Sequence, residues 1–349
     1  MSLFLLAALP DLHAVPSPFW LLTVLHLLTF VLHLVAMAAL VGGVLVVLAD
    51  RSPDRWSRPA VRRLLSLFPV LMAATVTLGI APLLFLQLSY GKVAYSAAIT
   101  SAVFWFLVPF FAMAAYACFY AASHRPVGDA GAGRWLHVGF TFLMAVALVY
   151  SSTFSLAEQP KEYARLYAAS ASGLVLNSDV LAWLPRWLQA VAGAAALGAF
   201  VTRLVVRDDE ALRATSARVL AGAALLAAIA AGARLALDGT FRAALGPVAM
   251  ASLAAGVVLP LLAVVLLRGS ARGRDLGAGA LLVGGLVCSV VARHLARLAT
   301  LSGTFDPAAP TVRPQWDVFV LFVVCLLGAV ATMAWMLRVW FGKGGARVG

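Results

Sequence analysis

Two histidines lie in the first long apolar stretch of the chain, residues 19–49, and they are the strongest candidates for chemistry. His26 and His33 are seven residues apart, a spacing that puts both on one face of a helix. Ionisable side chains inside a membrane are costly, so they mark a functional site by default. We expect His26 to bind a haem iron. His33 is a weaker candidate, for which a hydrogen bond to a neighbouring helix is the favoured interpretation.

A third histidine, His294, lies in the eighth apolar run. That run is predicted to cross the membrane in the opposite direction to the first, which places His294 at the same depth as His26, near the outer surface. Two imidazoles from different helices are the ligand set of a b-type haem. Arg293 and Arg297 are candidates to pair with its anionic propionates. The alternatives are a packing role for His26 and snorkelling of the two arginines to the lipid headgroups.

Other polar residues near the predicted membrane surfaces are weaker candidates. Glu158 and Gln87 are candidates for quinol and proton handling, although simple solvation is the favoured interpretation for Glu158. His137 lies at the cytoplasmic start of a span, where histidines are usually structural. In the second span, Gly79 permits close helix approach and Pro82 is expected to kink the helix. Later in the chain Arg234 and Asp238 are four residues apart, which predicts an ion pair.

The composition identifies the solvent of these residues as lipid. The chain has 349 residues, 63% hydrophobic and 11% charged, with mean hydropathy +0.97, a balance outside the range of soluble domains. Its formal net charge is +12, which in a soluble protein would indicate nucleic-acid binding. Here the basic residues sit mainly in short loops between apolar runs, the positive-inside pattern. We therefore exclude a nucleic-acid partner.

The apolar runs predict an all-α polytopic membrane bundle that forms one transmembrane domain, residues 1–349. Residues 1–17 are expected to form an outer interfacial segment. Basic residues follow the first, third, fifth, seventh and ninth runs, so we expect the N-terminus outside and the C-terminus in the cytoplasm. Two longer outer segments, 158–179 and 301–315, are candidate docking sites for a partner. We predict nine spans, at residues 19–49, 66–90, 97–123, 135–157, 180–205, 216–237, 246–268, 276–300 and 316–340.

Several short motifs occur in a characteristic order over roughly residues 18–205. Together with the topology they resemble subunit I of the cytochrome bd quinol oxidases. The resemblance implies a haem ligand at His26, quinol as electron donor, a second membrane subunit, and a place in the bacterial inner membrane. The motifs are Leu22-Thr23-Val24-Leu25-His26, Gly79-Ile80, Phe85-Leu86-Gln87 with Gly91, His137, Gln159-Pro160 and Val175-Leu176-Asn177.

The chain also departs from that family's pattern. Gln189 occupies the place of a histidine ligand in the fifth span, and Met250 is the only stand-in for the family's methionine ligand. Residues 104–122 carry no glutamate, and the long quinol loop is reduced to residues 238–245. Arg313-Pro314-Gln315-Trp316 only partly resembles the family's Gly-Arg-Gln-Pro-Trp motif. These losses argue against an oxygen reductase with three haems.

The expected function is a cytochrome bd-like redox subunit, part of a quinol-oxidising oxidoreductase complex. It would exchange electrons between the quinone pool and an outer partner such as a c-type cytochrome, through haem b. The alternative is a non-catalytic anchor or scaffold of a respiratory complex. A transporter is disfavoured because the span centres hold few charges and show no broken-helix repeat. Hydrolases and nucleotide-driven pumps lack their motifs.

Overall fold

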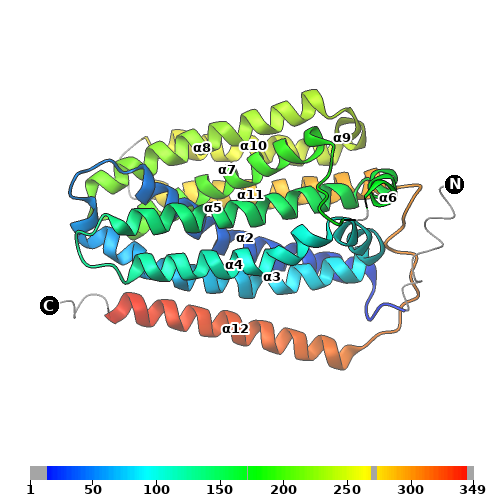
Figure 1. Cartoon of the computed structure of the whole chain (residues 1–349), viewed down its shortest axis with the longest axis horizontal. Coiled ribbons are helices and arrows are strands. Elements are labelled where there is room, and N and C mark those ends of the chain that lie inside the picture. The colour runs from blue at the N-terminus through cyan, green and yellow to red at the C-terminus, as the bar shows by residue number, and fades with distance from the viewer. Residues whose placement is uncertain (1–13, 171, 269–272, 344–349) are drawn as a thin grey trace.

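The computed structural model describes residues 14–170, 172–268 and 273–343, and in these residues the chain is a bundle of long α-helices (Figure 1). Nine of the described helices are long and apolar enough to cross a membrane, which confirms the predicted polytopic helix bundle. The protein is therefore a multi-pass membrane protein whose long helices contact lipid. These helices are α2 (Phe19–Ala49), α3 (Pro59–Thr100), α4 (Ala102–Ser123), α5 (Gly131–Ala157), α7 (Val180–Val205), α8 (Glu210–Leu237), α10 (Pro247–Leu266), α11 (Gly273–Leu301) and α12 (Trp316–Lys343).

Two short helices lie at one end of the bundle, which we call the α6 end (Figure 1). Helix α6 (Pro160–Ala169) and helix α9 (Gly239–Ala244) connect longer helices there. A 3-10 turn, Arg55–Ser57, lies in a different connection, between α2 and α3. Segment 158–179 was expected to be a loop, but it contains α6. Pro160 in the first turn and the acidic Glu162 favour a helix start there. This is the end predicted to face outside.

Some sequence predictions concern residues outside the described part of the chain. They are most of the expected interfacial segment, residues 1–13, and the basic loop residues within 269–272 and 344–349. Among the described residues, each of the nine predicted spans coincides with a long helix, although several helices extend further than predicted. The largest extension is in α3, which begins at Pro59 and ends at Thr100.

Helix α2 crosses α7 at very close range, and glycines make this possible. A Cβ on Gly198 would lie 1.7 Å from the carbonyl oxygen of Ala38, and a Cβ on Gly42 would lie 2.4 Å from the backbone nitrogen of Ala199. Small residues let helix backbones approach each other in lipid, where packing rather than water exclusion holds helices together. The crossing places α2 against α3 and α7, in the interior of the bundle.

Helix α3 leaves helical geometry at Tyr90, where φ is −127° and ψ is 22°. Pro82 was expected to be the kink, but the break falls eight residues later. Tyr90 is buried between Phe19 and Phe305, with ring centroids 6.3 and 6.2 Å away. Its side chain is thus packed at the α6 end, at the point where the last turns of α3 change direction.

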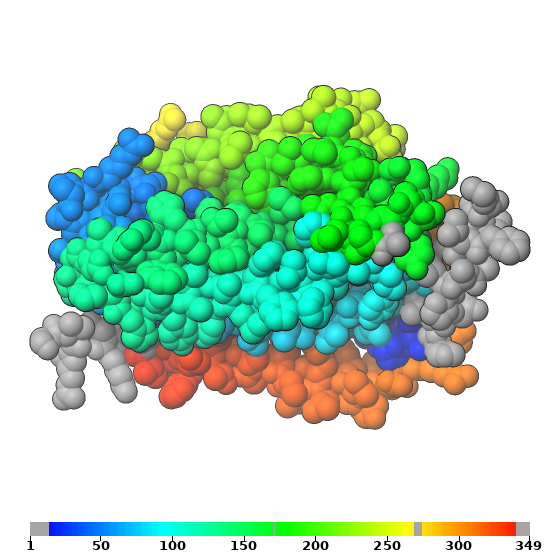
Figure 2. Space-filling view, in the orientation of Figure 1, coloured from blue at the N-terminus to red at the C-terminus, as the bar shows by residue number. Residues whose placement is uncertain are grey.

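Helix α12 lies along one edge of the bundle, as a ridge beside the helices coloured cyan (Figure 2). In the most apolar stretch of this helix, 18 residues long, no residue is buried inside the protein. Its contact with α3 includes an edge-to-face pair, Phe85 and Phe322, with centroids 4.9 Å apart. Helix α12 therefore presents most of its surface to lipid.

Candidate functional site

His26 occupies a buried position on α2, with 9% of its surface exposed. Its Nδ1 lies 3.0 Å from the carbonyl oxygen of Pro82 on α3. Because a carbonyl only accepts hydrogen bonds, Nδ1 carries the proton and donates, and Nε2 is left with a free lone pair. Phe30 stacks on the ring at a centroid distance of 5.7 Å. This contact from Nδ1–H to a carbonyl is the arrangement that commonly orients a metal-binding histidine.

His294 on α11 is the second buried imidazole at the α6 end. It is 8% exposed, and its Nδ1 has no hydrogen-bond partner among the described residues. It lies close enough to His26 for the two rings to interact electrostatically, and Arg293 and Arg297 also act on His26. The structure therefore brings together the two histidines that the sequence predicted at one depth.

His33 lies further along α2, away from this pair. Its Nδ1 is 2.9 Å from the carbonyl oxygen of Thr75 on α3, which is the hydrogen bond to a neighbouring helix that the sequence favoured. Gly79 makes room for the ring, since a Cβ there would lie 3.0 Å from Cε1 and Nδ1 of His33. The close approach predicted for Gly79 thus accommodates a histidine side chain.

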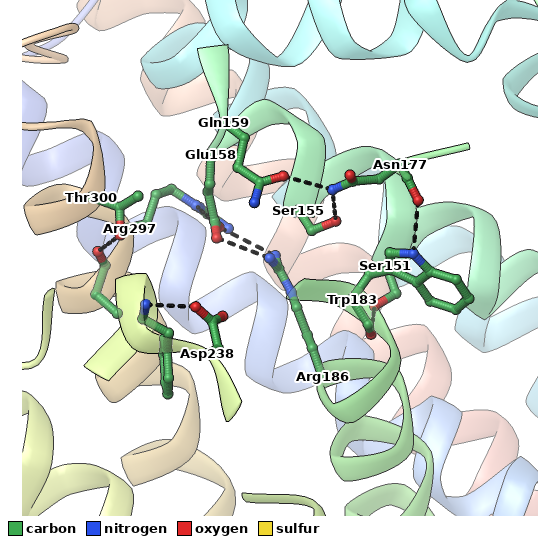
Figure 3. A network of polar contacts seen from close by, with 12 residues as sticks. Ser151, Ser155, Glu158, Gln159, Asn177, Trp183, Arg186, Asp238, Arg297 and Thr300 are labelled. Atoms are coloured by element: carbon green, nitrogen blue, oxygen red, sulfur yellow. Dashed lines mark hydrogen bonds and ion pairs between the residues drawn. The ribbon is translucent and has the colours of Figure 1, made fainter. Parts of the chain in front are cut away.

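Glu158 is the centre of an ion-pair network that links α5, α7 and α11 (Figure 3). Its two carboxylate oxygens accept hydrogen bonds from Arg186 at 2.9 and 3.3 Å, and Arg297 Nε donates at 3.1 Å. The side chain is only 13% exposed. The favoured interpretation of a solvated Glu158 was therefore wrong, because arginines from two other helices converge on it.

The charge state of Glu158 follows from this network. Burial by itself raises the pKa of the carboxyl, but the guanidinium groups of Arg186 and Arg297 outweigh burial and lower the pKa to about 2. Glu158 is therefore ionised at neutral pH and is a weak base. This favours a role in holding the arginines over a role in accepting protons.

Arg293 and Arg297 of α11 lie inside the bundle and do not snorkel to the surface as the alternative interpretation expected. Arg297 is 8% exposed and its guanidinium carbon lies 5.2 Å from the centre of the Tyr90 ring. The predicted pair of Arg234 and Asp238 is present, with Nε and Oδ2 3.8 Å apart. Arg293 has no hydrogen bond or ion pair with any residue that the structure describes.

Sequence reasoning missed Arg186. The available signal was an arginine seven residues into an apolar span, which by default indicates function or a buried partner. The sequence analysis also gave Asn177 no structural role. This residue is 3% exposed, and its side-chain amide donates hydrogen bonds to Ser155 and Gln159 at 2.9 and 2.8 Å. In return Trp183 Nε1 donates to the Asn177 carbonyl at 3.0 Å (Figure 3). These contacts hold the segment before α7 against the end of α5.

The remaining predicted site residues do not join the histidine pair. Met250 lies on α10 and is 38% exposed. His137 is exposed, and its Nδ1 is 2.7 Å from the carbonyl oxygen of Gly133 in its own helix. Gln87 is half-buried on α3. Gln189 of α7 lines an internal cavity and does not face the pair.

The sequence matches no family model and no curated protein. A haem needs only two protein ligands, because the porphyrin nitrogens supply the other four. His26 offers a free Nε2, and His294 offers a ring whose Nδ1 is unpartnered among the described residues. By type, His26 and His294 are the two ligands that a haem iron with two histidine ligands would need.

Proposed function

We propose that this chain is a cytochrome bd-like membrane redox subunit that carries one b-type haem on His26 and His294. The observation that supports this most is the hydrogen bond from His26 Nδ1 to the Pro82 carbonyl, 3.0 Å long, in a buried setting beside His294. A packing histidine can make the same bond, but here it leaves a lone pair on Nε2 of a ring that interacts electrostatically with a second buried imidazole.

The chain's own residues define what the site can do. The Pro82 carbonyl holds the His26 ring in one tautomer and one orientation. Arg297 places positive charge beside both histidines. That charge stabilises an anionic group at the site and favours its reduced state. The haem, when bound, supplies one-electron transfer.

We further propose that electrons pass between the quinone pool and a partner at the α6 end, such as a c-type cytochrome, in a bacterial inner membrane. Gln87 is the candidate contact for quinol. Helix α6 and segment 301–315 are the candidate docking surface, and a second membrane subunit is expected as in the family that the chain resembles. We assign Glu158 to hold Arg186 and Arg297 in place, because its pKa of about 2 makes it a poor proton acceptor at neutral pH.

The test is a reduced-minus-oxidised absorption spectrum with pyridine haemochrome quantification, on protein expressed with its partners and ample haem. We expect about one b-type haem per chain, the stoichiometry of one ligand pair. His26→Ala should abolish the spectrum. His137→Ala is the matched control and should retain it, because that histidine is exposed and bonds within its own helix. A flat spectrum from the unaltered protein would refute the proposal.

A second candidate function is a non-catalytic scaffold of a respiratory complex. The Glu158 network favours it, because the carboxylate already neutralises Arg297 at 3.1 Å, the charge that a propionate would otherwise pair with. Under this alternative, His26→Ala lowers thermal stability only, and the assembled complex keeps its redox spectrum.

A further inference from the structure

A partly open cavity of about 150 Å³ lies between α2, α7, α8, α9, α10 and α11. Small residues form much of its wall, among them Gly193, Ala224, Gly256 and Gly285. At Gly193 the lining is open, since a Cβ added there would meet no atom within 4 Å. Empty space inside a bundle forfeits packing contacts. A cavity of this size in lipid is therefore an expected place for an apolar ligand.

Three arginines line the same cavity at the α6 end: Arg186, Arg234 and Arg293. Arg186 is paired with Glu158, and Arg234 with Asp238. Arg293 has neither a hydrogen bond nor an ion pair in the described part of the chain. No acidic residue is among the residues that line the cavity. A guanidinium inside a helix bundle is costly without an anion beside it, and Arg293, which is only partly exposed, lacks such a partner among the described residues.

The surrounding charges do not supply the missing anion. Arg293 interacts electrostatically with Arg186, Arg234, Arg297 and Glu158, and three of these four groups are positive. With Asp238 included, four guanidinium groups face two carboxylates. An anionic group placed at Arg293 would therefore gain attraction from several sides. Each of the four guanidinium groups would then have an anionic partner, because Arg186 and Arg297 share Glu158.

We propose that this cavity binds a single-chain anionic amphiphile, with its carboxylate or phosphate group at Arg293 and its apolar chain along the small-residue wall. The arginines lie at the α6 end, and the wall runs inward from there past Ala194 and Leu197 of α7. Charged residues at the α6 end and an apolar wall further in match an amphiphile that enters from the leaflet at that end with its charged group nearest the surface. A cavity of about 150 Å³ holds roughly a benzene ring. It therefore takes only the first carbons of the chain, and the rest of the chain leaves through the open side of the cavity.

The proposed ligand is separate from the proposed haem. Neither His26 nor His294 lines the cavity, and a porphyrin is too large for its volume. Gln189, which lines the cavity, is not a normal haem ligand. The inference therefore goes beyond the redox function and does not depend on it.

The experiment is native mass spectrometry of the full chain, purified in a neutral detergent, stripped of lipid and titrated with twelve-carbon amphiphiles. The probes are dodecanoate, dodecyl phosphate, dodecanol and dodecylamine. We expect one dodecanoate or one dodecyl phosphate per chain, and neither the alcohol nor the amine. The tighter of the two anions identifies the source, a fatty acid or a lipid phosphate. Equal binding of dodecanol would overturn the proposal, because it would show that the arginines do not select the ligand.

Two variants locate the ligand in the cavity. Arg293→Gln should weaken binding about tenfold or more, the loss expected for one charge-assisted hydrogen bond, and the exposed Arg313→Gln is its control. Gly193→Leu should abolish binding by filling the cavity without a clash at its Cβ. Its control is Gly222→Leu, at an exposed and equally open position outside the cavity.

Unchanged binding in Gly193→Leu would refute the cavity as the site, and this variant serves even if Arg293→Gln does not fold. His26→Ala separates the two proposals, because it should lose the haem spectrum and keep the amphiphile. A chain that binds haem but no anion would overturn only the cavity proposal. A chain that binds the anion but no haem would overturn only the redox proposal.

Discussion

Replacing Glu158 by glutamine is the most informative single change at the α6 end. Glutamine keeps the size of the side chain and removes its charge. Arg186 and Arg297 would then lie buried without the carboxylate that they share, at 2.9 and 3.1 Å in the native protein. The helices that these residues tie together, α5, α7 and α11, would lose their common contact. We expect a large loss of stability with little change in helix content.

The magnitude follows from two independent estimates. Removing one partner of a buried ion pair costs about 3–5 kcal/mol, since the other charge stays buried and uncompensated. The lowering of the Glu158 pKa from 4.5 to about 2 corresponds to about 3 kcal/mol of stability at neutral pH. For a chain of this length, a loss of this size lowers the melting temperature by on the order of 5 °C.

The assay is thermal unfolding in detergent, followed by tryptophan fluorescence. Glu162→Gln is the matched control, because its carboxylate pairs with Arg165 in an exposed pair at 2.8 Å, and exposed pairs contribute little to stability. The pH dependence gives a second readout. The folded-state pKa of Glu158 is lowered, so its contribution is present above pH 4.5 and is lost as the pH falls towards 2. Glu158→Gln should remove this part of the acid sensitivity.

Two results would refute this reasoning. One is a melting temperature for Glu158→Gln no lower than that of Glu162→Gln. The other is an unchanged loss of stability between about pH 5 and pH 2 in the Glu158 variant, since that window belongs to a carboxyl with a lowered pKa. Either result would mean that the carboxylate of Glu158 is solvated and that the network does not hold the helices.

Three further substitutions test the packing, with Gly222→Leu, at an exposed and open position, as the common control. Gly79→Leu should cost about 1–3 kcal/mol in thermal unfolding, because its side chain meets the His33 ring at 3.0 Å; a melting temperature equal to the control would contradict this contact. Gly198→Val should prevent the crossing of α2 and α7 and yield aggregated protein in size-exclusion chromatography, since its Cβ would lie 1.7 Å from a backbone oxygen of α2. Asn177→Ala should cost about 1–3 kcal/mol by leaving buried partners unpaired, seen as faster proteolysis of the segment before α7.

The long helices could be predicted from the sequence because they depend on local information. An apolar run long enough to cross lipid must satisfy its backbone hydrogen bonds internally, so a run such as residues 19–49 forms a helix whatever surrounds it. The Arg234 and Asp238 pair is local for the same reason, since residues four apart on a helix are neighbours. The sequence also predicted that a neighbouring helix approaches closely at Gly79. It did not predict that the side chain at that position would be His33.

The environment of each polar residue was decided by tertiary structure. Glu158 is paired with residues 28 and 139 positions away in the chain, Arg186 and Arg297, and no local pattern distinguishes this from a solvated carboxylate. The rings that pack around Tyr90, Phe19 and Phe305, likewise come from distant parts of the chain.

The cavity and its unpaired Arg293 require six helices to be placed at once, because a void is defined only by all of its walls. The sequence therefore determined which segments lie in lipid, since that depends on the apolarity and length of single runs. Only the fold decided which buried charges meet and which one is left without a partner.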